Sequence, residues 1–371
     1  MATVEAVYAI GFEDVTKRWP PAPAALDHVD LAVAPGELFS IVGPSGCGKT
    51  TALRILAGLE RPTSGRVLQD RRDITRVEAH RRHFGFVTQQ NQLMNHLTTG
   101  GNISFPLEVR RPAKVRRPMD LVRDQARHLG IAHLLDARPS TLSEGQRRIV
   151  QLARAVISSP STLLLDEPLG FLEERARIRV RGEIVRLHRE RGLTSVMATA
   201  SQADAIAMSD RLAVLFDGTV EQVGDAPALL ERPATVRVAT FLGEPEMNIV
   251  SARVRVDGLH RWVDVLGHEV RVPSPELDPY AGGRVIVGIR PHDVIVGAPQ
   301  GSSIPCLVDR IEVHGTESHL HLIAADGSPV RAVVRGRPPT FGAVLDVAFP
   351  AVRMHLFDPT TSMSFHHPPV P

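Results

Sequence analysis

Hydrophobic and polar residues follow two different patterns along the chain, and the pattern changes near residue 240. Before that point, short apolar runs typical of buried strands alternate with segments that have apolar residues at helical spacing. The strand-like runs cover 36–43, 161–168, 193–198 and 212–216, and the helix-like segments cover 50–59 and 118–136. Strands separated by helices predict a parallel sheet in a layered α/β domain.

After Gly243 the pattern becomes short alternating segments separated by Gly, Pro and Asp, such as ARVRVDG, RVIVGIRP and SHLHLIAADG. This pattern is typical of an all-β domain, either a small barrel or a sandwich. We therefore expect two domains, at residues 1–240 and 241–371. The tail from about residue 362 is rich in proline, and we expect it to be disordered.

Composition excludes several classes of protein. The 371 residues include 43 Lys and Arg against 41 Asp and Glu, a net charge of +2 that gives no support to a nucleic-acid partner. The basic stretches 71–83 and 109–117 have few aromatics to stack on bases, so we interpret them as solvated surface. Two cysteines are too few for a disulfide framework. We see no signal peptide and no membrane span, so another chain would have to cross any membrane that this protein serves.

The stretch GPSGCGKTT at 43–51 fits the phosphate-loop pattern G-x-x-x-x-G-K-[ST]. Glycines let several backbone N–H groups point at one anion, and the following helix adds its positive end. The lysine would contact the β- and γ-phosphates of ATP, and Thr50 would bind Mg²⁺. The predicted ATP-binding residues here are Gly43, Pro44, Ser45, Gly46, Cys47, Gly48, Lys49, Thr50 and Thr51. We give the Cys47 thiol no catalytic role.

A second acidic motif, LLLDEP at 163–168, ends a predicted buried strand with two carboxylates. Asp166 is placed to hold Mg²⁺, directly or through water, and Glu167 to polarise the attacking water as a general base. A strand that ends in Asp-Glu is common, so this motif gains its meaning from the phosphate loop upstream.

Between these motifs, TLSEGQRRIVQLARAV at 141–156 resembles the signature sequence of the ABC transporter family. The resemblance implies that a helix N-terminus with exposed backbone faces the γ-phosphate of ATP held by a second subunit. ATP would then lie between two chains arranged head to tail, in a homodimer or a heterodimer. The residues placed there are Ser143, Glu144, Gly145 and Gln146, with Glu144 replacing the usual glycine.

Other parts of the family pattern follow in order. The resemblance places Trp19 where an aromatic ring stacks on adenine, and Gln89 where it senses Mg²⁺ and the attacking water. It also implies that the segment from Gln89 to about Leu107 faces a transmembrane permease subunit. The stretches 241–250, 287–293 and 355–359 are similar to landmarks of ATPases that serve carbohydrate importers, although importers of polyamines, iron or sulfate share this plan.

The resemblance implies a P-loop NTPase domain with a helical subdomain, followed by an all-β, OB-like domain that supports dimerisation and regulation. It further implies an ATPase that uses ATP and Mg²⁺ at the cytoplasmic face of the cell membrane. Its partners would be permease subunits and, through the complex, an extracytoplasmic solute-binding protein. No nucleic-acid partner is implied.

This sequence departs from the family pattern at residues expected to act in ATP hydrolysis. Ala200 occupies the position where the family carries a histidine that donates to the γ-phosphate, and Glu173 replaces a usual aspartate. The downstream residues Gln202 and Asp204 fix the alignment, so Ala200 is a substitution. Losing one such donor typically costs about 10²–10³ in rate, whereas ATP binding depends mainly on the phosphate loop and Mg²⁺. We therefore expect slow hydrolysis with near-normal ATP binding.

Three functions remain open at this point. The chain could be the ATP-binding subunit of an importer for a carbohydrate, paired with a second ATPase that keeps its histidine. It could be a hydrolysis-deficient, ATP-clamped dimer that regulates a permease or another partner, or a soluble ATPase outside transport. His319 and His321 lie two residues apart on one predicted strand face. With no convincing further ligands in the sequence, we interpret them as surface histidines.

Overall fold

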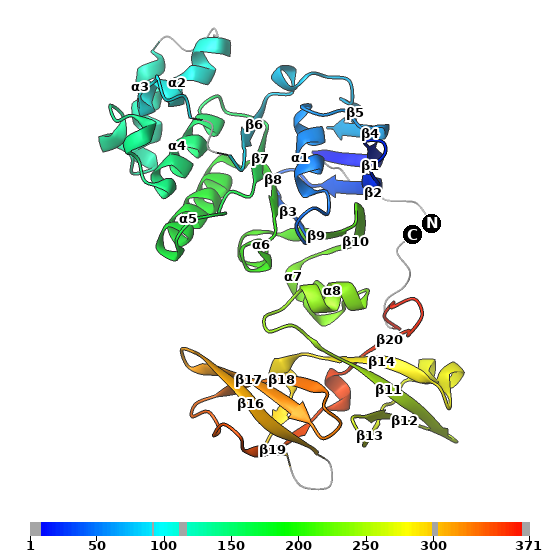
Figure 1. Cartoon of the computed structure of the whole chain (residues 1–371). Helices are drawn as coiled ribbons and strands as arrows, with labels where there is room; N and C mark the ends of the chain where they lie inside the picture. The colour runs from blue at the N-terminus through cyan, green and yellow to red at the C-terminus, as the bar shows by residue number, and fades with distance from the viewer. Residues whose placement is uncertain (1–8, 91–92, 111–116, 299–302, 366–371) are drawn as a thin grey trace. The chain divides into compact units, whose positions relative to one another are not determined.

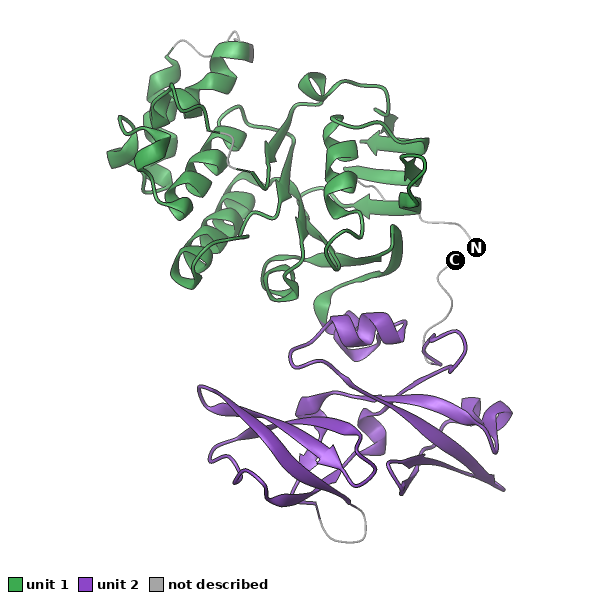
Figure 2. Cartoon of the chain, viewed as in Figure 1, with its two compact units in different colours: residues 1–226 green, residues 227–371 purple. Residues whose placement is uncertain are grey.

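The computed structural model describes residues 9–90, 93–110, 117–298 and 303–365. The chain forms two compact units, residues 1–226 and 227–371 (Figure 2). Sequence patterning placed this division near residue 240. The difference arises because the short helix α8 (Val236–Phe241) contributes Ala239 to a small apolar cluster with Met247 and Phe357 of the C-terminal unit.

Unit 1 is an α/β structure whose elements follow the alternation seen in the sequence (Figure 1). Its strands are β1 (Ile10–Arg18), β2 (Ala24–Val33), β3 (Leu38–Val42), β4 (Ser64–Gln69), β5 (Arg72–Asp73), β6 (Phe84–Val87), β7 (Thr162–Asp166), β8 (Thr194–Thr199), β9 (Arg211–Phe216) and β10 (Thr219–Gly224). Its helices are α1 (Lys49–Ala57), α2 (Thr99–Arg110), α3 (Pro118–His128), α4 (Glu144–Val156), α5 (Glu174–Arg191) and α6 (Gln202–Met208).

The central sheet of unit 1 has the strand order β10-β9-β3-β8-β7-β6 and is parallel except for the β9–β10 pair. Every residue of β3, β7 and β8 is buried, as expected for strands covered on both faces. Because these three strands are neighbours and parallel, their carboxyl ends meet at one edge of the sheet. The segments that follow them carry Gly43, Glu167 and Ala200.

Helices lie on both faces of this sheet, as the full burial of β3, β7 and β8 requires (Figure 1). On one face, Leu164 of β7 packs with residues of α1 and of the antiparallel sheet β2-β1-β4-β5. On the other, Leu163 and Leu165 pack with residues of α4 and α5. Helices α2 and α3 join α4 in that second core and form the expected helical subdomain.

Unit 2 is all-β apart from short helices, as the alternating pattern predicted (Figure 1). One antiparallel sheet has the order β13-β12-β11-β14-β20 and the other β15-β19-β16-β17-β18. The strands are β11 (Asn248–Asp257), β12 (His260–Val265), β13 (His268–Arg271), β14 (Arg284–Ile289), β15 (Ile295–Val296), β16 (Ile304–His314), β17 (Glu317–Ala324), β18 (Pro329–Arg335), β19 (Val344–Ala348) and β20 (His355–Phe357). Helix α7 (Ala226–Glu231) precedes α8, and alternate strand residues from both sheets form one core.

The start of the proline-rich tail is ordered, which corrects the expectation of disorder from residue 362. Met363 forms a β-bridge with Thr235, and Ser364 forms one with Phe357. The Phe365 ring stacks on Tyr280 with their centroids 5.1 Å apart. These contacts bury backbone and ring surface that a free tail would expose. Residues 366–371, the rest of the expected disordered tail, lie outside the described residues.

No helix among the described residues is both long and apolar enough to cross a membrane.

Candidate nucleotide-binding site

The loop between β3 and α1 has the backbone shape of an anion-binding nest. Gly46 and Gly48 have φ values of 83° and 111°, which favour glycine. A Cβ at Gly48 would also lie 2.2 Å from the carbonyl oxygen of Ala25. Helix α1 begins directly after this loop at Lys49, so its first N–H groups and its positive dipole end face the same space.

Lys49 is buried and lies over the loop. Its Nζ donates to the carbonyl oxygens of Gly43 and Pro44, each at 2.8 Å. These bonds hold the ammonium beside the nest, where it adds a full positive charge to the partial charges of the backbone. The arrangement suits a polyphosphate.

Thr50 and Asp166 join the two sequence motifs directly. The Thr50 hydroxyl donates to Asp166 Oδ1 at 2.9 Å, across 116 positions of sequence. Burial raises the pKa of Asp166, against the opposing effects of the Thr50 bond and the Lys49 charge. A hydroxyl and a buried carboxylate side by side are hard oxygen donors, and a cation would offset the cost of burying the charge. These residues therefore fit Mg²⁺.

Glu167 is held in place by the chain segment after β8. Its Oε1 accepts from the backbone N–H of Ala200 at 2.8 Å, and its Oε2 accepts from the Thr199 hydroxyl at 3.2 Å. Its backbone φ of 45° lies in the left-handed region, a kind of strain that recurs at functional sites. Burial raises the pKa of its carboxyl, which brings it closer to the range of an effective general base.

Ala200 is exposed at the end of β8. Its backbone N–H positions Glu167, but its methyl side chain has no hydrogen to donate to a phosphate. The next residue, Ser201, caps α6 by accepting from the N–H of Asp204 at 3.2 Å. The predicted base, Glu167, is therefore held in place, while the side chain at position 200 adds no donor.

A cavity of about 260 Å³ brings eight of the predicted residues together. Its lining residues are Ala25, Ser45, Gly46, Gly48, Lys49, Thr50, Thr51, Gln89 and Glu167. Gly43, Pro44 and Cys47 belong to the same loop but do not line the cavity, nor does Asp166, which reaches it through Thr50. Burial raises the pKa of the Cys47 thiol, so the neutral form is favoured.

Trp19 does not line this cavity. Its ring is 44% exposed and lies under the Lys17 ammonium, with Nζ 4.7 Å from the ring centroid. The ring is therefore accessible, but its role against adenine stays a prediction.

The signature residues also lie outside the cavity, at the start of α4. Ser143 and Gln146 form a reciprocal capping box: the Ser143 hydroxyl accepts from the Gln146 N–H at 3.3 Å, and Gln146 Oε1 accepts from the Ser143 N–H at 2.8 Å. Glu144 pairs with Arg147 at 2.6 Å, and a Cβ at Gly145 would lie 3.1 Å from the Cβ of Ala176. This helix end is capped by its own side chains, and its residues do not line the cavity beside the phosphate loop.

Sequence reasoning missed three residues that shape the site. Ala25 lines the cavity, and Thr199 holds Glu167. Arg148 of α4 donates to the carbonyl oxygens of Thr88 at 2.8 Å and Gln89 at 3.3 Å, and so ties the signature helix to the Gln89 loop. The arginine pair at 147–148 was a visible signal, but only the fold shows where the side chain reaches.

Comparisons with known protein families cover both units. The family described as ABC transporter matches residues 26–170, the MalK OB fold domain matches 243–294, and the TOBE domain matches 287–357. The last two matches confirm the prediction of an OB-like all-β second domain.

Similar curated proteins match almost from end to end. The sn-glycerol-3-phosphate import ATP-binding protein UgpC of Escherichia coli O6:K15:H31 is 34% identical over 347 residues, covering 94% of this chain and 97% of that protein. The protein of the same name from Chromobacterium violaceum is 35% identical over 360 residues, covering 96% of each.

Solved structures match part of the chain. A dimeric ATP-binding cassette in a post-hydrolysis state bound to ADP and Pi aligns with a TM-score of 0.53 and 28% identity, covering 58% of this chain and 98% of that one. A second dimeric bacterial ABC transporter cassette gives a TM-score of 0.54 and 29% identity over the same shares.

The raised pKa of Glu167 predicts a pH-dependent effect of Glu167→Gln on stability. In the folded chain the pKa of this carboxyl lies above its ordinary value of 4.5. The free energy of unfolding therefore falls as pH rises through the folded-state pKa. Gln keeps an oxygen for the Ala200 N–H but carries no charge. At about pH 7.5 we expect the variant to unfold with a free energy higher by on the order of 1 kcal/mol. Near pH 4 it should match the parent chain.

Urea unfolding across this pH range measures the difference. The matched control is Glu244→Gln, which removes the same charge from an exposed carboxylate and should leave the pH dependence unchanged. If Glu167→Gln changed the free energy of unfolding by the same amount at every pH, the raised pKa of Glu167 would be contradicted.

Proposed function

Because the chain belongs to the ABC transporter ATP-binding family, we propose that it is the ATPase subunit of an importer for a sugar or a related carbohydrate. The observation that carries this proposal is the near full-length similarity to sn-glycerol-3-phosphate import ATP-binding proteins, across both the nucleotide-binding unit and the OB-like unit. A phosphate loop alone would have indicated a nucleotide site without a cargo class.

Each group of site residues would have its own role in ATP hydrolysis. The loop N–H groups and Lys49 would hold the β- and γ-phosphates, and Glu167 would orient and deprotonate the attacking water. Thr50, Asp166 and Gln89 would hold Mg²⁺, which when bound neutralises charge on the phosphate oxygens.

A second ATP-binding chain would complete each site. Support comes from the capped N-terminus of α4, which carries Ser143 and Gly145 but lies outside the chain's own cavity. The similar solved structures are dimers. In the proposed assembly, this end contacts the γ-phosphate bound by the partner, and the segment from Gln89 to Leu107 contacts a permease at the cytoplasmic face. An extracytoplasmic solute-binding protein would deliver the cargo.

We further propose that hydrolysis by this chain is slow. Ala200 positions Glu167 through its backbone but offers no side-chain donor to the γ-phosphate. ATP binding should be near normal, because the loop, Lys49 and the Mg²⁺ ligands are all in place. A partner ATPase with an intact histidine would then supply the faster turnover. The two other functions, a hydrolysis-deficient dimer that regulates a permease or another partner and an ATPase outside transport, gain no support, since the similar proteins are import subunits.

Ala200→His should restore the missing donor. We expect single-turnover ATP hydrolysis to rise by about 10²–10³, with little change in ATP affinity. Rapid-quench measurement on the purified chain with Mg²⁺ gives the rate, and nucleotide titration gives the affinity. The control is Ala203→His on the exposed side of α6, which adds the same side chain three positions away and should leave the rate unchanged. A rise of less than about tenfold in Ala200→His would reject slow hydrolysis through the lost donor.

Uptake by the parent organism tests the importer itself. Deletion of the gene should abolish uptake of one labelled solute among glycerol phosphate, maltose-type sugars and monosaccharides. The wild-type gene should restore it, and a Lys49→Met gene should not, because that chain lacks the charge held over the phosphate loop. Unchanged uptake of every such solute after deletion would overturn the proposed cargo class.

A further inference from the structure

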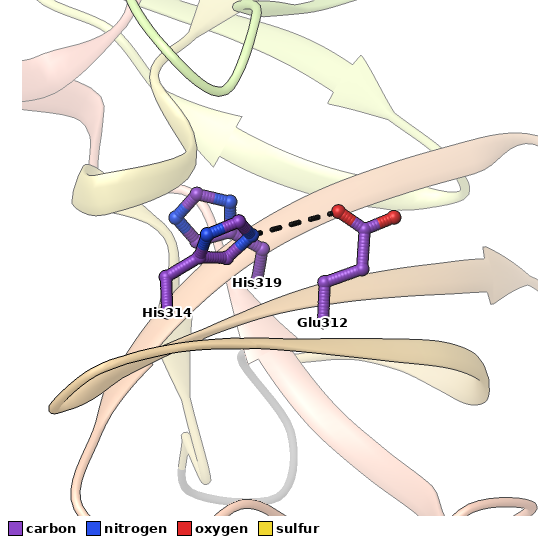
Figure 3. A group of neighbouring side chains, drawn as sticks. All are labelled: Glu312, His314 and His319. Atoms are coloured by element: carbon purple, nitrogen blue, oxygen red, sulfur yellow. Dashed lines mark ion pairs between the residues drawn. The ribbon is translucent and has the colours of Figure 1, made fainter. Parts of the chain in front are cut away.

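A cluster of metal-ligating side chains lies in unit 2, on the hairpin formed by β16 and β17 (Figure 3). In the antiparallel register, Glu312 is directly opposite His319. His314 is two residues beyond Glu312 on the same strand, so all three side chains stand on one face of the sheet. One ligand atom from each residue lies within 4.8 Å of the other two.

We propose that Glu312, His314 and His319 bind a divalent transition-metal cation of the zinc class. Two imidazole nitrogens and one carboxylate oxygen are a donor set that suits such a cation better than Mg²⁺ or Ca²⁺. Three protein donors leave a coordination position open for water or for a group from a partner.

The distances require only small side-chain movements. Zn²⁺ bonds of about 2.0–2.1 Å at tetrahedral angles place neighbouring donor atoms about 3.3 Å apart. His314 Nε2 is already 3.7 Å from Glu312 Oε2, and the two histidine rings stack with centroids 4.3 Å apart. His314 is exposed, so its ring has room to turn toward a shared cation.

Neighbouring groups orient the carboxylate. His321 Nε2 lies 3.1 Å from Glu312 Oε1, and Arg310 Nε lies 3.3 Å from the same oxygen. Both partners engage one oxygen and leave Oε2 turned toward His314. Hydrogen bonding to the non-ligating side of a carboxylate is a recurrent feature of metal sites.

The competing explanation is an ion-pair patch that needs no metal. Glu312 pairs with His314 and His321 when those rings are protonated, and Arg335 pairs with Glu317 at 3.0 Å nearby. Exposed pairs of this kind contribute little to stability. The two explanations differ in one measurable property, which is saturable binding of a cation.

Calorimetric titration of the full-length chain with Zn²⁺ separates them. His366 and His367 form an adjacent pair in the tail, so the test uses a His366→Gln, His367→Gln background. We expect one Zn²⁺ per chain in that background. His319→Gln and Glu312→Gln should each weaken binding by more than about tenfold, and His321→Gln by about tenfold, because it removes an orienting bond.

The matched control is His268→Gln on β13, which should leave Zn²⁺ affinity unchanged. Without metal, all variants should melt like the background, because the substituted side chains lie outside the apolar core. Binding of Co²⁺ with the visible absorption of a tetrahedral site would support the same assignment. Absence of saturable Zn²⁺ binding, or equal binding by His319→Gln and the background, would overturn the proposal.

Discussion

The hydrogen bond from Thr50 to Asp166 joins the phosphate loop to the acidic end of β7. The fold of unit 1 brings these two residues together. Thr50 stands at the start of α1, and Asp166 ends β7. They meet because β3, β8 and β7 are adjacent parallel strands whose carboxyl ends share one edge. Cores on both faces of the sheet fix that register, since a shift of one residue would reverse every side chain.

In the proposed mechanism, ATP binding and ATP hydrolysis depend on different parts of this site. Phosphate binding rests on loop backbone, Lys49 and the Thr50–Asp166 pair, which are all built into α1, β3 and β7. Positioning of the base rests on the turn after β8, through the Thr199 hydroxyl and the Ala200 N–H. In that mechanism, a side-chain change at position 200 would alter turnover and leave the phosphate contacts in place. The proposed pairing with a second, faster ATPase is consistent with this separation.

Local patterns in the sequence predicted most of the fold and the nucleotide site. A strand, a glycine loop and a helix follow one another in the chain, so the phosphate loop could be placed without knowing the fold, and Asp166 and Glu167 end an obvious buried strand. Features that depend on distant pairing were not predictable. Arg148 reaches the Gln89 loop only after α4 packs beside β6, and His314 joins His319 only after the β16–β17 hairpin sets its register. The expected start of the disordered tail at residue 362 was wrong, because proline content does not predict the β-bridges that Met363 and Ser364 form.

The most direct measurement is the gain in ATP affinity that Mg²⁺ produces, compared between Thr50→Val and Thr51→Val. Both residues line the cavity and both substitutions remove a hydroxyl, but only Thr50 bonds to Asp166. We expect the Mg²⁺-dependent gain to disappear in Thr50→Val and to persist in Thr51→Val. A Thr50→Val chain that keeps the full gain would contradict the central claim that this pair holds the metal and unites the site.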